Sequence, residues 1–278
     1  MLLSKGANHF TTDKNGVDSL MYACILGRYN NVTFWLSKFQ DWDVNRGNIF
    51  NGATALHAAV YIGRNKMKTV QALLKSDRVS LDVLNDGGGS VLSSAVSSTD
   101  SNVDVVRYLL SRTLKYGVNH RRKAGTTKWK IIYRIARGLF RLRFTTSGLF
   151  KMFASESGST PMQYAVYRGD IEIVELLMEH GAKPFIKNDL GRDVVSYCNA
   201  FPEIKSAIER VKREAKQGRT ETKVIVKTEP DDKVVAATAA AGRKGKKDFT
   251  LQRHLTTCVP VKYDMYLLNL STIMKLFG

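Results

Sequence analysis

Four copies of one sequence unit recur along this chain, and this repetition constrains its fold more than any other feature. The clearest copy occupies residues 158–182 and reads GSTPMQYAVYRGDIEIVELLMEHGA. A second copy begins at Gly52, and two weaker copies open at Asp18 and Ser90. The openings at Asp18, Thr54 and Ser90 are spaced by 36 residues, and the ends of the units recur every 37 residues. Both intervals indicate tandem units that stack on one another.

Each unit has the pattern of two short helices. Its first half combines a long apolar residue with small residues and ends near a glycine, which suits a short helix packed closely on its neighbours. Its second half carries Val-Val-x-x-Leu-Leu, as at residues 105–110, which places apolar side chains on one stripe of a helix. Neither helix is long enough to bury its apolar face alone. The pattern therefore predicts an all-α solenoid of helix-turn-helix repeats of about 33–37 residues.

The units resemble the ankyrin repeat family. Residues 160–165 read TPMQYA and residues 54–59 read TALHAA, close to the family signature T-P-L-H-x-A, and Gly169 and Gly181 continue the match. The resemblance implies a module that binds one or more partner proteins through a concave surface of turn tips and first helices, with no cofactor, metal or small-molecule substrate. It also places the partner-contacting residues in the turns: Asp13, Asn15, Arg46, Asn48, Asn51, Asn85, Asp86, Lys187 and Asp189.

The repeat pattern divides the chain into four segments. Residues 1–119 hold repeats, the first of them partial because residues 2–8 match only the end of a unit. Residues 120–157 break the pattern, and residues 158–210 resume it with a more polar closing unit. Residues 211–278 are expected to form a flexible basic tail, within which an apolar stretch at 261–277 predicts a terminal helix.

The segment that breaks the pattern is strongly basic. Residues 105–155 contain 13 Lys and Arg residues and no Asp or Glu, in a chain whose net charge is +18. Residues 128–144 have the order of an amphipathic helix, with isoleucine and leucine residues between 131 and 142 expected on its apolar face. The opposite stripe of this helix carries the basic side chains Lys130, Arg134, Arg137 and Arg141.

Two interpretations of this basic helical insert are open. It fits a degenerate repeat that packs within the solenoid, with Trp129, Tyr133, Phe140 and Phe144 in the core, although these rings could instead stack on nucleic-acid bases. It also fits an interaction element for an acidic partner, an anionic membrane surface or nucleic acid, because solvated helix faces usually mix both charges. The second interpretation gives two alternative functions, a nucleic-acid-associated regulator and a peripheral adaptor on anionic membranes.

The tail carries two short motifs that bear on regulation and location. Residues 226–229 read VKTE and resemble the site to which the modifier SUMO is attached, which makes Lys227 a candidate modification site. The run Arg243–Lys247 resembles a basic nuclear import signal. Three scattered cysteines favour a reducing compartment, and no secretory signal is visible. We therefore expect an intracellular protein, cytoplasmic or nuclear.

Nothing in the sequence predicts catalysis. The five histidines are isolated and lack the spacing of metal ligands. Residues 87–90 read GGGS, but the lysine of a phosphate-binding loop is absent and the position precedes a repeat helix. The family resemblance gives His57 a structural role, in which its ring bonds neighbouring turns. Cys24 and Cys198 occupy small-residue positions of first helices, where burial is expected.

Overall fold

The computed structural model describes residues 3–98, 100–142, 148–198, 201–210 and 213 of the 278-residue chain. The described residues up to Glu209 form one compact unit. Its regular elements are helices, apart from one isolated bridge between Thr12 and Asp18. The candidate modification site Lys227, the basic run Arg243–Lys247 and the predicted terminal helix all lie outside the described residues.

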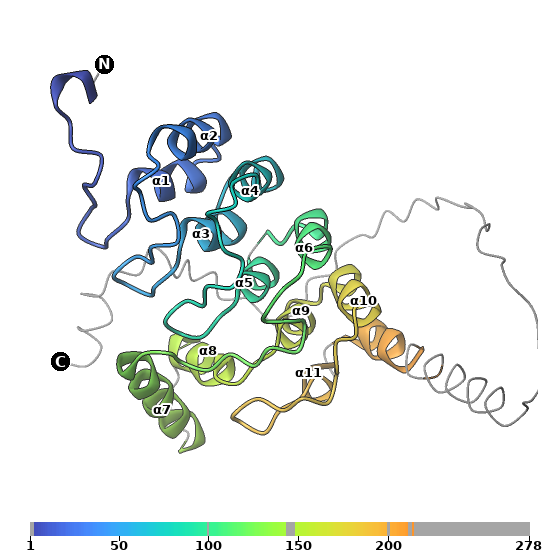
Figure 1. Ribbon diagram of the computed structural model, residues 1–278. Helices are drawn as coiled ribbons and strands as arrows, with labels where there is room; N and C mark the ends of the chain where they lie inside the picture. Colours follow the sequence, from blue (N-terminus) through green and yellow to red (C-terminus); the bar gives the residue numbers. More distant parts are fainter. Residues whose placement is uncertain (1–2, 99, 143–147, 199–200, 211–212, 214–278) are drawn as a thin grey trace, which may run out of the picture. The chain divides into compact units, whose positions relative to one another are not determined.

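Helix pairs repeat along the compact unit (Figure 1). The first helices of the pairs are α1 (Ser19–Ile25), α3 (Ala55–Tyr61), α5 (Val91–Ser97) and α9 (Pro161–Arg168). The second helices are α2 (Tyr29–Lys38), α4 (Lys66–Leu74), α6 (Val103–Leu110) and α10 (Ile171–Glu179). The closing unit comprises α11 (Val195–Cys198) and helical residues 202–210, and a 3-10 turn, η1 (Leu3–Lys5), precedes the first pair.

The first helices begin at the openings predicted from the sequence. Asp18, Thr54 and Ser90 are N-caps, and the side chain of each accepts a hydrogen bond from the backbone N–H three residues further on. These bonds satisfy donors that the start of a helix leaves without an intrahelical partner. The 36-residue spacing of the openings therefore has a direct structural cause.

The first helices stack in one row and the second helices in another (Figure 1). α1 packs on α3 and α3 on α5, while α2 packs on α4, α4 on α6 and α6 on α10. Leu56, Leu92 and Met162 occupy equivalent positions of three first helices, and all three are almost fully buried. Cys24 and Cys198 are buried in the same row, as expected from their small-residue positions. The repeat solenoid predicted from the sequence is the architecture of this unit.

The row of first helices continues without a gap past the basic segment. α5 packs directly on α9, although their openings, Ser90 and Thr160, lie 70 residues apart in the chain. The helices between them, α7 (Thr127–Arg141) and α8 (Gly148–Glu156), pack chiefly on each other. A degenerate repeat within the stack would separate α5 from α9, whereas these two helices are in contact.

The inserted segment leaves the stack at the tip of a turn. In the third unit a tight turn closes where Gly88 N donates to Asn85 O at 2.8 Å. In the fourth unit Gly158 N donates to Arg122 O at the same distance, so Arg122 stands where the third unit has asparagine. Two residues separate the ends of the ordinary turn, whereas residues 123–157 separate them here. The insert expected at 120–157 is thus an excursion of residues 123–157 from a turn tip.

The α7–α8 helix pair has a small core of its own. Trp129, Tyr133 and Ala136 of α7 are buried and pack against Phe153 and Ala154 of α8. The Trp129 ring meets the rings of Tyr133 and Phe153 edge to face, with centroids 5.7 and 5.6 Å apart. Aromatic residues of the insert therefore form a core, which leaves the rings of Trp129, Tyr133 and Phe153 unavailable for stacking on a ligand. Phe144 lies outside the described residues.

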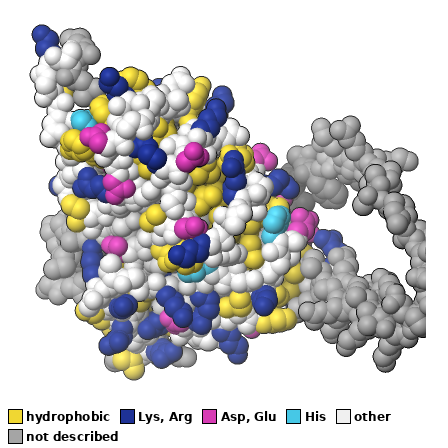
Figure 2. Space-filling view, in the orientation of Figure 1, with side chains coloured by type: hydrophobic (Ala, Val, Ile, Leu, Met, Phe, Trp, Pro, Cys, Tyr) yellow, Lys and Arg dark blue, Asp and Glu magenta, His cyan; other side chains and the backbone are white. Residues whose placement is uncertain are grey.

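The apolar face of α7 differs from the one that helical periodicity predicts. Ile131, Ile135 and Leu142 are 52%, 39% and 65% exposed, so they contribute little to the core. The aromatic side chains occupy the face toward α8, and the aliphatic side chains fall beside it. Figure 2 shows Lys and Arg side chains gathered over the lower part of the view, where α7 lies in Figure 1.

Candidate interaction site

Backbone hydrogen bonds join the tips of successive turns into one row. Ile49 N donates to Asn15 O at 2.9 Å, and Asp86 N donates to Asn51 O at 2.8 Å. The row continues through the inserted segment, because Gly125 N donates to Asp86 O at 2.9 Å. Most residues expected to contact a partner therefore lie on or next to one continuous edge of the repeat stack.

Three of the expected contact residues face inward from that edge. Asn48, Asn51 and Asn85 are only 7%, 5% and 8% exposed. Their side-chain oxygens accept backbone N–H bonds within their own turns, for example from Gly89 N to Asn85 Oδ1 at 2.8 Å. These asparagines hold the shape of the turns, as short amide side chains commonly do, and are not available to a partner.

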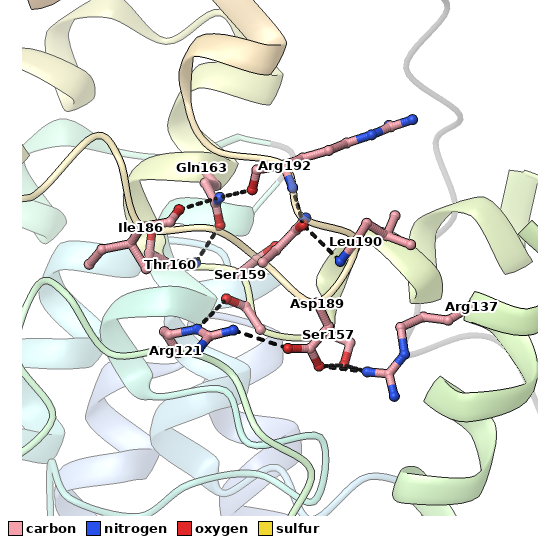
Figure 3. A network of polar contacts seen from close by, with 12 residues as sticks. Arg121, Arg137, Ser157, Ser159, Thr160, Gln163, Ile186, Asp189, Leu190 and Arg192 are labelled. Carbon is pink, nitrogen blue, oxygen red and sulfur yellow. Dashed lines mark hydrogen bonds and ion pairs between the residues drawn. The ribbon is translucent and has the colours of Figure 1, made fainter. Parts of the chain in front are cut away.

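Asp189 joins the last turn to the inserted helices (Figure 3). Its carboxylate accepts from Arg121 at 3.0 Å and from both Arg137 and Ser157 at 2.5 Å. Arg141 donates to the backbone oxygen of the same residue at 3.2 Å. Charge-assisted bonds of this kind are among the stronger polar contacts in proteins. Asp189 therefore anchors α7 to the repeat stack, and its carboxylate is already engaged.

A second contact lies at the other end of α7. The Lys128 ammonium donates to Phe50 O at 3.0 Å and lies 5.6 Å from the centre of the Phe50 ring. Burial raises the pKa of Asp86, and the nearby charge of Lys128 opposes that shift. The inserted segment therefore touches turn tips in three repeats, at Phe50, Asp86 and Asp189.

A buried ion pair joins the two ends of the inserted segment. Arg122 Nη1 lies 3.3 Å from Glu156 Oε2, and both side chains are less than a tenth exposed. Arg122 also donates to the hydroxyl of Tyr164 at 3.0 Å, and the hydroxyl of Tyr133 donates to Gly87 O at 3.3 Å. Burial raises the pKa of Glu156, and the Arg122 guanidinium opposes this shift. Arg122, directly before the excursion, and Glu156, near its end, thus hold the two ends of the excursion together.

The remaining predicted residues divide by exposure. Lys187 is exposed, whereas Asp13, Asn15 and Arg46 are half-buried at turns along the same edge. On α7, Arg137 is half-buried against Asp189, while the other three predicted basic side chains are exposed: Lys130, Arg134 and Arg141. The structure therefore keeps most of the basic stripe of α7 at the surface, while Arg137 and Arg141 also contact Asp189 of the last turn.

His57 links adjacent turns through both nitrogens of its ring. Nδ1 lies 2.9 Å from Thr54 Oγ1 and accepts from Thr54 N at 3.4 Å, and Nε2 lies 3.3 Å from Gly89 O. An N–H at Nε2 and a lone pair at Nδ1 satisfy these bonds, which is the neutral form of the ring. Burial lowers the pKa of His57 from 6.5 to about 4, so the ring stays neutral at pH 7.

We expect acid to destabilise the fold through His57. Below pH 6.5 the unfolded chain takes up a proton that the buried ring does not, so stability falls from pH 6.5 down to about pH 4. This shift in the pKa of His57 corresponds to a loss of roughly 3 kcal/mol in the free energy of unfolding. Gln163 makes the equivalent contacts, to Thr160 N and Arg192 O, in the fourth repeat while carrying no charge, so His57→Gln should retain the fold and flatten the dependence of stability on pH. Urea unfolding of the unmodified protein and of His57→Gln between pH 4 and pH 6.5 measures this effect. If the free energy of unfolding falls equally in both proteins, the prediction is contradicted.

The sequence analysis did not predict the buried ion pair between Arg122 and Glu156. Arg122 lies 37 residues after Asn85, which is the interval between unit ends. This interval indicates that Arg122 is a turn residue. Glu156 is the first acidic residue after a stretch of 51 residues with none, which was a second signal. No signal in the sequence showed that Asp189 would meet Arg137, because the two lie 52 residues apart.

Two further features are absent from the residues that the structure describes. Within these ranges, no three or more His, Cys, Asp or Glu side chains are grouped so that they could hold a metal ion. Across the same part of the chain, no helix combines the length and apolar character needed to cross a bilayer.

Comparison with known families agrees with this architecture. A model of three tandem ankyrin repeats matches residues 20–122, and a model of a single ankyrin repeat matches residues 157–189. The unmatched stretch between them, residues 123–156, coincides with the excursion that holds α7 and α8. A comparison with curated proteins finds no match. Ankyrin repeats are generally protein–protein interaction modules, and proteins built from them are typically non-catalytic scaffolds. The repeated helix pairs and the two family matches together show that residues 20–122 and 157–189 of this chain are ankyrin repeats.

Proposed function

We propose that this protein is a non-catalytic adaptor that binds a partner protein through the face shared by its first helices and turn tips. The observation that carries the proposal is the unbroken row of first helices, in which α5 packs on α9 despite the 70 residues between their openings. An insertion that leaves the row intact is what we expect where the row itself is used. An intracellular setting fits the buried thiols of Cys24 and Cys198.

Exposed apolar side chains on this face support the proposal. Tyr22 of α1 is 46% exposed, and Ile49 at the second turn tip is 67% exposed. A few buried anchor residues, tyrosine prominent among them, supply most of the binding energy at protein interfaces. Because the α7–α8 pair already contacts Phe50, Asp86 and Asp189, we expect the partner to use the turn tips and first helices nearest the N-terminal end of the stack.

The proposal predicts a difference between two exposed apolar positions. Ile49→Asp, on the turn-tip face, should weaken capture of the partner from a cell lysate at least tenfold, because a charge replaces an apolar anchor. Phe34→Asp is the matched control, because Phe34 is 55% exposed but lies on the second helix α2. Quantitative mass spectrometry of the proteins captured by each variant measures the difference. Loss with Phe34→Asp but not with Ile49→Asp contradicts the proposal.

A third variant tests whether the inserted segment, and not the face of first helices and turn tips, binds the partner. Residues 123–157 are replaced by Asp-Leu, the pair that closes the ordinary turn at 189–190, together with Arg122→Asn. The second change removes a buried charge that would lose its partner Glu156. Under the proposal this variant still captures the partner in low and high salt. If capture disappears with the inserted segment while Ile49→Asp has no effect, the proposal is overturned.

A further inference from the structure

The outer face of α7 carries a line of aliphatic side chains that the helix pair does not bury. We define this face by six exposed side chains: Lys130, Ile131, Arg134, Ile135, Arg141 and Leu142. At 100° per residue, Ile131, Ile135 and Leu142 fall within one narrow stripe along the helix. Isolated exposed aliphatic residues are common, but Ile131 and Ile135 of α7 and Leu142 at its C-cap lie in line and form an apolar ridge.

The basic side chains lie directly beside this ridge. Lys130, Arg134 and Arg141 form a second stripe next to the aliphatic one, by the same helical periodicity. The acidic residues that would normally balance such a stripe are absent from residues 105–155. The gathering of Lys and Arg over this part of the surface is visible in Figure 2. The face therefore pairs an apolar ridge with positively charged side chains.

The face is held in a fixed orientation. Trp129, Tyr133 and Ala136 bury the opposite side of α7 against α8. The ion pair between Arg137 and Asp189, at 2.5 Å, ties the helix to the last turn. A ligand consequently meets a preformed surface and does not have to order the helix, which removes an entropic penalty of binding.

We propose that the outer face of α7 binds the surface of an anionic lipid bilayer. Aliphatic side chains of an interfacial helix enter the boundary between headgroups and acyl chains, while Lys and Arg meet the anionic headgroups. A protruding ridge suits a bilayer, which adapts to it, better than it suits a rigid protein partner. Nucleic acid would use the basic stripe through its phosphates but gives the aliphatic ridge no comparable role. This inference does not depend on the proposed partner face.

Flotation of the full-length protein with lipid vesicles tests the proposal. The protein should float with vesicles of phosphatidylcholine and phosphatidylserine, and much less with phosphatidylcholine alone. Lys130→Glu/Arg134→Glu should weaken binding to the anionic vesicles at least tenfold, because each basic residue near such a surface contributes severalfold. Ile131→Ser/Ile135→Ser should weaken it about tenfold by removing apolar side chains.

Matched controls make the result specific. Lys38→Glu/Lys75→Glu makes the same charge change at exposed positions on the second-helix side of the first two repeats and should float like the unmodified protein. Ile49→Asp should also float normally, which separates this proposal from the proposed partner face. Failure of the unmodified protein to float with anionic vesicles at low salt overturns the proposal.

Duplex DNA and single-stranded RNA serve as competing ligands with the same variants. If either binds more tightly than the vesicles, and Lys130→Glu/Arg134→Glu removes binding while Ile131→Ser/Ile135→Ser does not, the face reads phosphates and the bilayer proposal is wrong. Far-UV circular dichroism of each variant confirms that these exposed changes leave the helices formed.

Discussion

Replacing Glu156 with leucine is expected to lower the free energy of unfolding by about 3–5 kcal/mol, because it leaves the charge of Arg122 buried without its partner. Both side chains are less than a tenth exposed, so water cannot take the place of the lost carboxylate. Urea unfolding at pH 7 measures the change. Trp129 lies within the α7–α8 core and provides a fluorescence signal from the segment that this ion pair closes.

The double variant Arg122→Leu/Glu156→Leu is the control for this prediction. Removing both charges leaves no unpaired ion, so the double variant should be more stable than Glu156→Leu alone. A loss below about 1 kcal/mol for Glu156→Leu would contradict the prediction. That outcome would mean that burial keeps the Glu156 carboxyl protonated in the folded chain, so that no ion pair exists to be broken.

Gly88→Ala should be the second most damaging change. Gly88 has φ +80°, a left-handed conformation that disfavours any side chain, and an added Cβ would lie 1.9 Å from Lys123 O. The left-handed backbone costs about 1–2 kcal/mol and the clash with a backbone atom adds about 1–3 kcal/mol. We therefore expect a total loss of about 2–5 kcal/mol in urea unfolding.

Gly191→Ala separates the two contributions. Gly191 has φ +79° at the same position of the last turn, but an added Cβ there meets no atom within 4 Å. Its substitution should show only the backbone penalty of about 1–2 kcal/mol. The difference between the two variants measures how firmly the start of the inserted segment presses on the third turn. Equal losses would show that Lys123 moves aside freely.

The repeats could be predicted from the sequence because their interactions are local. Asp18, Thr54 and Ser90 cap helices that begin one residue later, and the bonds they make span three residues. Leu56 and Leu92 recur at the same place in each unit because each repeat needs the same contact with its neighbours. A fixed period therefore encoded both the helix starts and the core.

The turn tips were predicted in position but not in role. The family resemblance placed Asn48, Asn51 and Asn85 at turns, where the structure also has them. Whether a turn side chain points outward or bonds its own backbone depends on local geometry that residue type alone does not fix. Asparagine is suited to both roles, so only the structure distinguished them.

The sequence by itself determined the repeat period, the helix starts, the buried positions of the repeats and the basic character of the inserted segment. Only the tertiary structure decided that this segment stands outside the stack, that Arg122 pairs with Glu156 and that Asp189 holds Arg137. The reason is the range of the interactions. Capping and helical periodicity act over a few residues and leave a visible pattern, whereas contacts between residues 34 to 52 positions apart depend on how the chain returns to itself.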